Sequence, residues 1–282
     1  MKEINFDELN NFSTLPETIF KSSDADIRYK TKDEVLREFN REKWLQILDE
    51  IKKDKGILLK DIDFKIEEFD KSFPFFYKKK FYLGSGKQIF QKHIEVFKNV
   101  LDPYIKDASS LVELGAGYGS KILNLSNYEN YSELPLFAGE FTNNGCNAIK
   151  LLSQRMNKKI EVGHCDLNEE VVEGIKVPKN SIIFTSYAAH YVKKFSTTFI
   201  DFILEMDPKI VINFEPCYET HSDSKYGSMC KRYIELNDYN LNMISVLEDA
   251  HKNGKIKVEI TKNVIGSNPF LPISIIKWQK AK

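Results

Sequence analysis

The chain has 282 residues and a formal net charge of zero, because 41 Lys and Arg side chains balance 41 Asp and Glu. With 42% hydrophobic residues it has the composition of a globular protein, which excludes a fibrous or wholly disordered chain. No basic excess attracts nucleic acid or an anionic membrane, so neither partner is expected without stronger local evidence.

The sequence shows no targeting signal, and its cysteine spacing is that of an ordinary intracellular protein. No run approaches the roughly 20 apolar residues that cross a bilayer, and the first twelve residues lack the basic and apolar regions of a signal peptide. We therefore expect a cytoplasmic protein that makes no membrane contact. The four cysteines form no C-x-x-C pair, so buried thiols are predicted, with no disulfide framework and no metal site.

The N-terminal 87 residues are expected to be a mainly helical extension. Thr31 and Glu34 form a capping box ahead of a helix that should stop near Gly56, with one apolar stripe at Val35, Phe39, Leu45, Leu48 and Ile51. Residues 73–82 crowd aromatic side chains around three lysines. This segment is either an anchor that docks the extension on the main domain or a lid that lines a substrate pocket.

From residue 88 onward the pattern predicts a second unit, 88–282. A helix over 88–105 should end at the Pro103 region. Short apolar runs then alternate with helical patterns, as in βαβ units: strands are expected at 110–115, 135–140, 159–163, 181–186 and 209–214, with helices between them, notably at 142–157 and 195–206. A long helix at 228–253 and an antiparallel hairpin of 256–266 with 271–280 should follow. The prediction is an α/β fold with a doubly wound, mostly parallel, seven-stranded sheet.

Residues 113–119, Glu-Leu-Gly-Ala-Gly-Tyr-Gly, lie between an expected strand and a helix that begins near Ser120. Glycines at alternate positions let the backbone turn sharply after the strand and let a ligand approach the main chain. A dinucleotide motif starting at Gly115 and Gly117 would have Ser120 as its third glycine, so that match is imperfect. Glu113 suits the ammonium group of an amino-acid-bearing ligand better than a pyrophosphate.

Acidic residues follow the next two expected strands. Glu140 ends the second strand, where a carboxylate can accept hydrogen bonds from both ribose hydroxyls of an adenosine. After the third strand, Asp166 can accept from an adenine amino group while Leu167 packs on the ring; the alternative for Asp166 is an exposed loop position. NAD enzymes share the ribose acid, so these residues indicate a nucleoside without fixing the cofactor.

Taken in order, these motifs resemble those of the class I S-adenosylmethionine-dependent methyltransferases. The resemblance covers residues 88–282 and extends to the terminal antiparallel strand pair of that family. It implies S-adenosylmethionine as the cofactor and S-adenosylhomocysteine as the product, and N-terminal extensions in such enzymes commonly close over the substrate. The donor site is then expected to comprise Glu113, Gly115, Gly117, Gly119, Glu140, Asp166, Leu167 and Ser186.

The acceptor side should lie just past the fourth and fifth strands. His190 and Tyr187 follow the fourth strand, and His190 is the candidate general base, with a capping or backbone-bonding histidine as the alternative. Glu215 ends the fifth strand, where a carboxylate is costly unless it is used. It could hold a cationic acceptor or serve as a cap or ion-pair partner. The expected catalytic residues are His190, Tyr187 and Glu215, and the expected substrate-binding residues are Tyr191, Asn213, Tyr218 and Glu219.

The sequence thus predicts transfer of a methyl group to a nitrogen or oxygen of a small polar or peptide-like acceptor. Three alternatives stay open: a binding or regulatory protein that retains the nucleoside pocket without turnover, an RNA methyltransferase that uses the cluster at 73–82, and an NAD-linked oxidoreductase. The sequence leaves the acceptor and the oligomeric state undetermined, a homodimer being one option.

Overall fold

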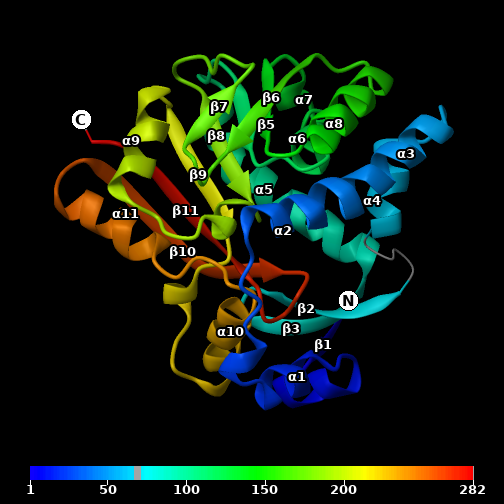
Figure 1. Ribbon diagram of the computed structural model, residues 1–282, viewed down its shortest axis with the longest axis vertical. Coiled ribbons are helices and arrows are strands. Elements are labelled where there is room, and N and C mark those ends of the chain that lie inside the picture. The colour runs from blue at the N-terminus through cyan, green and yellow to red at the C-terminus, as the bar shows by residue number, and fades with distance from the viewer. Residues whose placement is uncertain (67–70, 282) are drawn as a thin grey trace.

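The computed structural model describes residues 1–66 and 71–281, and it centres on one mixed sheet (Figure 1). Eleven strands of the described chain lie in the order β1-β3-β2-β10-β11-β9-β8-β4-β5-β6-β7. The five parallel strands in the middle of this order were all predicted. They are β4 (Leu111–Leu114), β5 (Leu136–Glu140), β6 (Ile160–Asp166), β8 (Ile182–Ser186) and β9 (Ile210–Glu215).

Helices cover both faces of the parallel strands, because strands that are apolar on both sides must bury two surfaces. One hydrophobic cluster joins the sheet to α5 (Gly86–Ile105), α6 (Ser120–Leu125) and α8 (Asn143–Arg155), and a second joins it to α9 (Thr197–Glu205) and α11 (Met243–Lys252). The short helix α7 (Glu129–Ser132) precedes β5. This arrangement confirms the doubly wound α/β layout.

The predicted C-terminal hairpin is also present. Strand β10 (Ile256–Gly266) pairs antiparallel with β11 (Ile273–Lys280), and β11 pairs antiparallel with β9. The seven predicted strands therefore all exist, but they belong to a larger sheet that is mixed and not mostly parallel, because antiparallel pairs outnumber parallel ones among the described strands. Strand β7 (Val171–Glu173) extends one edge, and three strands from the N-terminal segment extend the other.

Helices form much of the N-terminal segment, but it also contributes three strands to the common sheet, which the sequence did not predict. They are β1 (Lys2–Ile4), β2 (Ser72–Tyr77) and β3 (Lys80–Ser85). Strand β2 pairs with β10, and its Phe75 and Phe76 are buried, so the aromatic cluster anchors this segment by continuing the sheet. The helices of the segment are η1 (Phe6–Asn11), α1 (Leu15–Lys21), η2 (Asp24–Asp26), α2 (Lys32–Leu36), η3 (Arg37–Trp44), α3 (Leu45–Lys53) and α4 (Leu59–Ile66).

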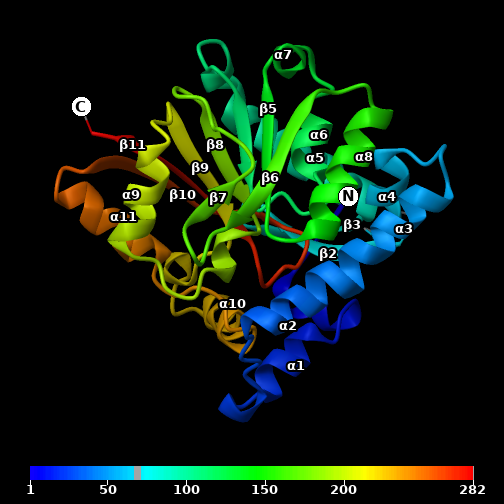
Figure 2. The same cartoon turned by 45° about the horizontal axis from the view of Figure 1, so that its top comes forward.

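The helix predicted from the Thr31 capping box exists as one continuous run, α2, η3 and α3, and it lies beside α8 in both ribbon views (Figures 1 and 2). The η3 part is a π-helix, whose i→i+5 hydrogen bonds widen the turn and shift the inward-facing register. Leu45 of the predicted stripe is consequently 38% exposed, while Trp44 packs on the core. The widened turn could not be seen in a 3.6-residue pattern.

Helix α5 includes Pro103 and ends at Ile105, the predicted end. One other helix prediction needs correction. The single helix predicted at 228–253 is two helices, α10 (Lys225–Leu236) and α11, separated by a loop. In that loop Asn240 donates its side-chain amide to the Val192 carbonyl, and such side-chain bonds compete with helix continuation. The remaining helical turns are η4 (Ala189–Tyr191) and η5 (Tyr218–Thr220).

Two further observations concern the described residues. All four cysteines are buried and free, as predicted. No helix in the described ranges combines the length and the apolarity that a membrane span requires.

Candidate functional site

A cavity of about 300 Å³ opens at the carboxyl ends of the parallel strands. The chain leaves β4 toward β5 on one side, and β8 lies on the other side, so this is the point where the strand order reverses and where α/β sheets bind ligands. The cavity wall includes five residues predicted for the donor site, Gly115, Gly117, Glu140, Asp166 and Leu167, and two predicted for the acceptor side, Tyr187 and Tyr191.

The glycine loop is built so that only glycine fits. Gly115 and Gly117 have φ values of +77° and +59°, in the left-handed region that side chains rarely adopt. A Cβ on Gly115 would lie 2.3 Å from the Cβ of Ala188, and one on Gly117 would lie 3.1 Å from the Trp44 ring. The loop therefore presents bare backbone to the cavity. Gly119, also left-handed, serves as the N-cap of α6 and does not line the cavity.

Glu140 and Asp166, the two acids predicted to bind the nucleoside, both line the cavity but have different partners. Glu140 is buried and accepts hydrogen bonds from the Gly117 amide at 2.8 Å and from the Thr142 amide at 2.9 Å, and burial raises its pKa. It thereby couples the glycine loop to the end of β5. Asp166 ends β6 and lies 2.7 Å from the Nζ of Lys32. Both carboxylates keep a place on the cavity wall.

Glu113 lies behind the glycine loop, outside the cavity. Its carboxylate is 2% exposed and accepts a hydrogen bond from the Ile122 amide at 3.0 Å, in the first turn of α6. Burial raises the pKa of Glu113 to about 8, against the opposing effect of this hydrogen bond and of Lys121. In this position Glu113 braces the helix that follows the loop.

The N-terminal helix run closes the cavity, and none of its residues was predicted as a site residue. Val35, Phe39 and Trp44 line the wall together with Lys30 and Lys32. Asn40 of η3 attaches the cover to α8: its side-chain oxygen accepts from the Asn144 amide, and its carbonyl accepts from the Asn144 side chain at 2.9 Å. The capping box and the apolar stripe located this helix. Nothing local in the sequence indicated which loop it would cover.

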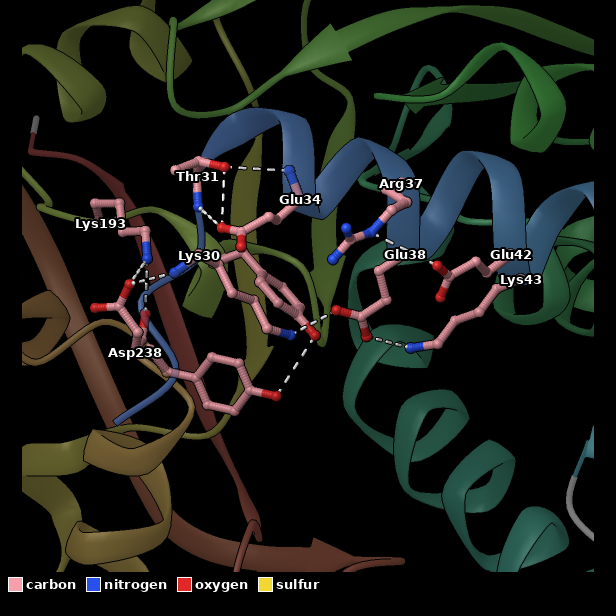
Figure 3. Close-up of polar contacts among 11 residues, drawn as sticks. Lys30, Thr31, Glu34, Arg37, Glu38, Glu42, Lys43, Lys193 and Asp238 are labelled. Atoms are coloured by element: carbon pink, nitrogen blue, oxygen red, sulfur yellow. Dashed lines mark hydrogen bonds and ion pairs between the residues drawn. The ribbon is translucent and has the colours of Figure 1, made fainter. Parts of the chain in front are cut away.

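Ion pairs fasten this cover on its other side (Figure 3). The Nζ of Lys30 lies 2.6 Å from Glu38, which also pairs with Lys43 at 2.7 Å. The Lys30 amide donates to Asp238 at 3.1 Å, and Asp238 pairs with Lys193, which follows η4. One network therefore links the cover, the loop after β8 and the loop between α10 and α11.

A third attachment runs through Asp63 of α4. This side chain is 1% exposed and accepts hydrogen bonds from Tyr118 Oη at 2.7 Å, Ser120 Oγ at 2.7 Å and Asn124 Nδ2 at 2.8 Å. Tyr118 belongs to the glycine loop and Ser120 begins α6. A buried carboxylate from the N-terminal segment thus fixes the loop from behind.

His190 and Glu215 form a buried pair next to the cavity. The Nδ1 of His190 lies 3.0 Å from Glu215 Oε2, and the same carboxylate accepts from the amides of Ala188, Ala189 and His190 at 3.0–3.3 Å. His190 is 2% exposed and Glu215 fully buried. Glu215 therefore holds the turn η4 and orients the imidazole. Neither side chain lies on the cavity wall.

Tyr187 directly follows β8 and has a φ of +49°, a strained conformation for a non-glycine residue. It lines the cavity, as does Tyr191, whose ring lies 5.4 Å from that of Phe39 on the cover. Burial raises the pKa of the Tyr191 hydroxyl above its usual range. These two rings form the cavity wall nearest the end of β8.

The remaining predicted residues lie away from the cavity. Asn213 bonds Thr185 at 3.0 Å and the indole of Trp278 at 2.8 Å, within the core. Tyr218 donates to Glu235, and Glu219 accepts from the Ile244 and Ser245 amides at the start of α11. Ser186 is buried, and its Oγ has no hydrogen-bond partner within the described residues.

Known proteins were compared with the chain by sequence and by structure. No protein-family model and no curated protein sequence matches it. Among solved structures, magnesium protoporphyrin IX methyltransferase from Synechocystis PCC 6803, with bound SAH (S-adenosylhomocysteine), is 11% identical. That match has a TM-score of 0.51 and covers 89% of this chain and all of the other. This chain has the class I methyltransferase fold.

Two further similar structures have lower TM-scores. An O-methyltransferase from Bacillus cereus in complex with SAH is 12% identical. The match covers 67% of this chain and 81% of the Bacillus chain, with a TM-score of 0.47. Geranyl diphosphate C-methyltransferase from Streptomyces coelicolor is 10% identical, with coverages of 69% and 84% and a TM-score of 0.44.

Proposed function

We propose that this protein is an S-adenosylmethionine-dependent methyltransferase that acts on a nitrogen or oxygen of a small polar or peptide-like acceptor. The observation that carries the proposal is the cavity at the strand-order reversal, where bare glycine backbone meets the carboxylates of Glu140 and Asp166. The fold and the SAH bound to the Synechocystis neighbour support the same cofactor.

The residues present suit this cofactor. Gly115 and Gly117 leave room for its amino-acid part, Glu140 offers carboxylate oxygens to the ribose hydroxyls, and Asp166 with Leu167 is placed for the adenine. When bound, S-adenosylmethionine supplies a methyl group on a sulfonium: the acceptor lone pair forms the new bond while the electrons of the C–S bond stay on sulfur, giving S-adenosylhomocysteine.

The chain's own contribution is alignment and exclusion of water. The cover of α2 and η3 closes the cavity from above, while Tyr187 and Tyr191 wall the end of β8. Glu215 fixes the turn that carries His190, so the imidazole is held in one orientation beside these rings. In this arrangement Glu215 is a positioning residue, and His190 keeps its predicted role as the candidate base.

A parallel calorimetric titration with S-adenosylmethionine, S-adenosylhomocysteine and NADH tests the cofactor. We expect micromolar binding of the two sulfur ligands and none of NADH, and we expect Glu140→Ala to lose most of this affinity. Binding of NADH alone would refute the proposal. Incubation with a radiolabelled methyl donor and amine, hydroxyl and RNA acceptors then separates an enzyme from a silent binding protein.

His190→Gln tests the base once an acceptor is known. If His190 removes the acceptor proton, the variant should lower kcat by roughly 100-fold or more while the affinity for S-adenosylhomocysteine stays unchanged. An unchanged kcat would assign His190 to structure alone.

A further inference from the structure

A second cavity, of about 250 Å³, shares Tyr187 with the first cavity. Its wall combines helix α5, the start of α6, the end of β8 and the turn between β10 and β11. The lining residues are Phe90, His93, Lys121, Tyr187, Ser267 and Asn268. A strained residue shared by two cavities at the carboxyl end of a strand marks the place where donor and acceptor would meet.

One wall of this second cavity carries a buried imidazole. His93 is 4% exposed, its Nε2 lies 3.1 Å from Ser267 Oγ, and its ring centroid lies 6.2 Å from that of Tyr187. Burial, assisted by Lys121, lowers the pKa of His93 to about 3, so the ring is neutral at physiological pH. A neutral ring and a hydroxyl can exchange their mutual hydrogen bond for bonds to an incoming N–H or O–H.

Another wall carries a cation. Lys121 lies over the Phe90 ring, with its Nζ 5.3 Å from the ring centroid. Within residues 1–66 and 71–281 no carboxylate lies within ion-pair distance of Lys121, although ion pairs occupy many other lysines of the protein. With no acid among the described residues that line it, the cavity is electrostatically suited to an anion.

We infer that this second cavity is the acceptor pocket of the proposed methyltransferase. It would take a small aromatic molecule that bears an anionic group and a hydroxyl or amine. The anion is held by Lys121, the ring packs between Phe90 and Tyr187, and the hydroxyl or amine meets His93 and Ser267. This inference rests on the proposed function only for the methyl donor. The new O–C or N–C bond forms as the C–S bond of the donor breaks, and the acceptor proton leaves through His190, the candidate base of the proposed function.

Histidine NMR tests the pocket without requiring turnover. Protein labelled at histidine is titrated with 4-hydroxybenzoate or with its uncharged counterpart 4-hydroxybenzyl alcohol, each with and without S-adenosylhomocysteine. The His93 signal is assigned from its loss in His93→Gln. We expect the benzoate to shift this signal and to bind about tenfold more tightly than the alcohol, the difference that one charge-assisted contact makes.

Three variants locate the anion site. Lys121→Ala should weaken benzoate binding about tenfold, Lys121→Arg should retain most of it, and Lys257→Ala, an exposed lysine of β10, should leave it unchanged. The inference is overturned if the His93 signal does not move, if the two probes bind equally, or if Lys121→Ala binds benzoate like the wild type. Thermal unfolding of each variant checks that it is folded.

The same titrations distinguish the two proposals. Binding of S-adenosylhomocysteine with no benzoate response at His93 removes the acceptor pocket and leaves the methyltransferase proposal intact. A benzoate response that needs Lys121, without any binding of S-adenosylhomocysteine, supports the pocket and removes the methyltransferase proposal.

Discussion

The Nζ of Lys32 lies 2.7 Å from the Oδ2 of Asp166, so the N-terminal cover is attached directly to a carboxylate on the cavity wall. The two side chains differ in burial: Lys32 is 54% exposed and Asp166 is 7% exposed. The hydrogen bond to Asp166 raises the pKa of Lys32. Asp166 therefore combines the proposed adenine contact with the attachment of the cover.

Removing Lys32 and removing Asp166 should lower the affinity for S-adenosylmethionine by different amounts. Lys32→Ala removes a half-exposed ion pair, which contributes at most about 1 kcal/mol, so we expect the affinity for S-adenosylmethionine to fall less than about fivefold. Asp166→Ala removes the proposed adenine contact as well and should cost about tenfold or more. Calorimetric titration measures both. Glu173→Ala, at an exposed position of β7 that does not line the cavity, is the control, and a larger loss for Lys32 than for Asp166 would contradict the assignment.

The glycine loop offers a matched pair of substitutions. Gly117→Ala places a Cβ 3.1 Å from Trp44 at a positive φ, whereas Gly254→Ala introduces similar strain, at a φ of +71°, with nothing within 4 Å. Both should lose about 1 kcal/mol of stability in a urea titration. Only Gly117→Ala should also lose affinity for S-adenosylmethionine. Equal affinities in the two variants would show that the loop does not contact the ligand.

Asp63 should stabilise the folded protein, because it holds the glycine loop and the start of α6 from behind. Asp63→Ala leaves three side-chain donors without their buried partner, and we expect a loss of about 3 kcal/mol in the free energy of unfolding. Asp63→Asn, which keeps one accepting oxygen, should lose less. Urea denaturation compares them with Lys60→Ala on the same helix, which should change little. A loss for Asp63→Ala no greater than that of the control would contradict this role.

Glu113 should make the protein less stable as the pH rises toward about 8. In the folded protein its carboxyl holds a proton up to a pKa of about 8, whereas the unfolded chain releases it near 4.5. The folded state therefore binds more protons between these values, and stability falls with increasing pH until about pH 8. The buried His93 and His221, whose pKa values burial lowers to about 3 and about 4, affect stability below pH 6.5 instead.

Between pH 6.5 and pH 8 the change in stability therefore reports on buried acids such as Glu113 and not on these histidines. Glu113→Gln keeps an oxygen for the Ile122 amide but cannot ionise, so its stability should fall about 2 kcal/mol less than that of the wild type across this window. Thermal unfolding over this range measures the difference. Glu161→Gln, an exposed position on β6, should follow the wild type. A wild-type slope in Glu113→Gln would show that another group is responsible.

The order and identity of the elements were largely predictable from the sequence. The five parallel strands and the terminal hairpin follow from short apolar runs between helical patterns, which are local features. The glycine loop, Glu140 and Asp166 were predictable for the same reason, since each lies at a fixed offset from the end of its strand. Glu113, Asn213 and Glu219 have the right residue types near those ends, but their side chains point into the core or toward helix starts.

Tertiary structure alone decided what closes the site. Trp44 covers Gly117 because a π-turn shifts its helix by part of a turn, and Lys32 reaches Asp166 across a large separation in sequence. His93 and Lys121 come together with Ser267 only because α5, α6 and the β10–β11 turn converge beside Tyr187. Periodicity and motif spacing describe neighbours along the chain. Contacts between distant segments depend on how helices pack on the finished sheet, and that packing is a property of the whole core.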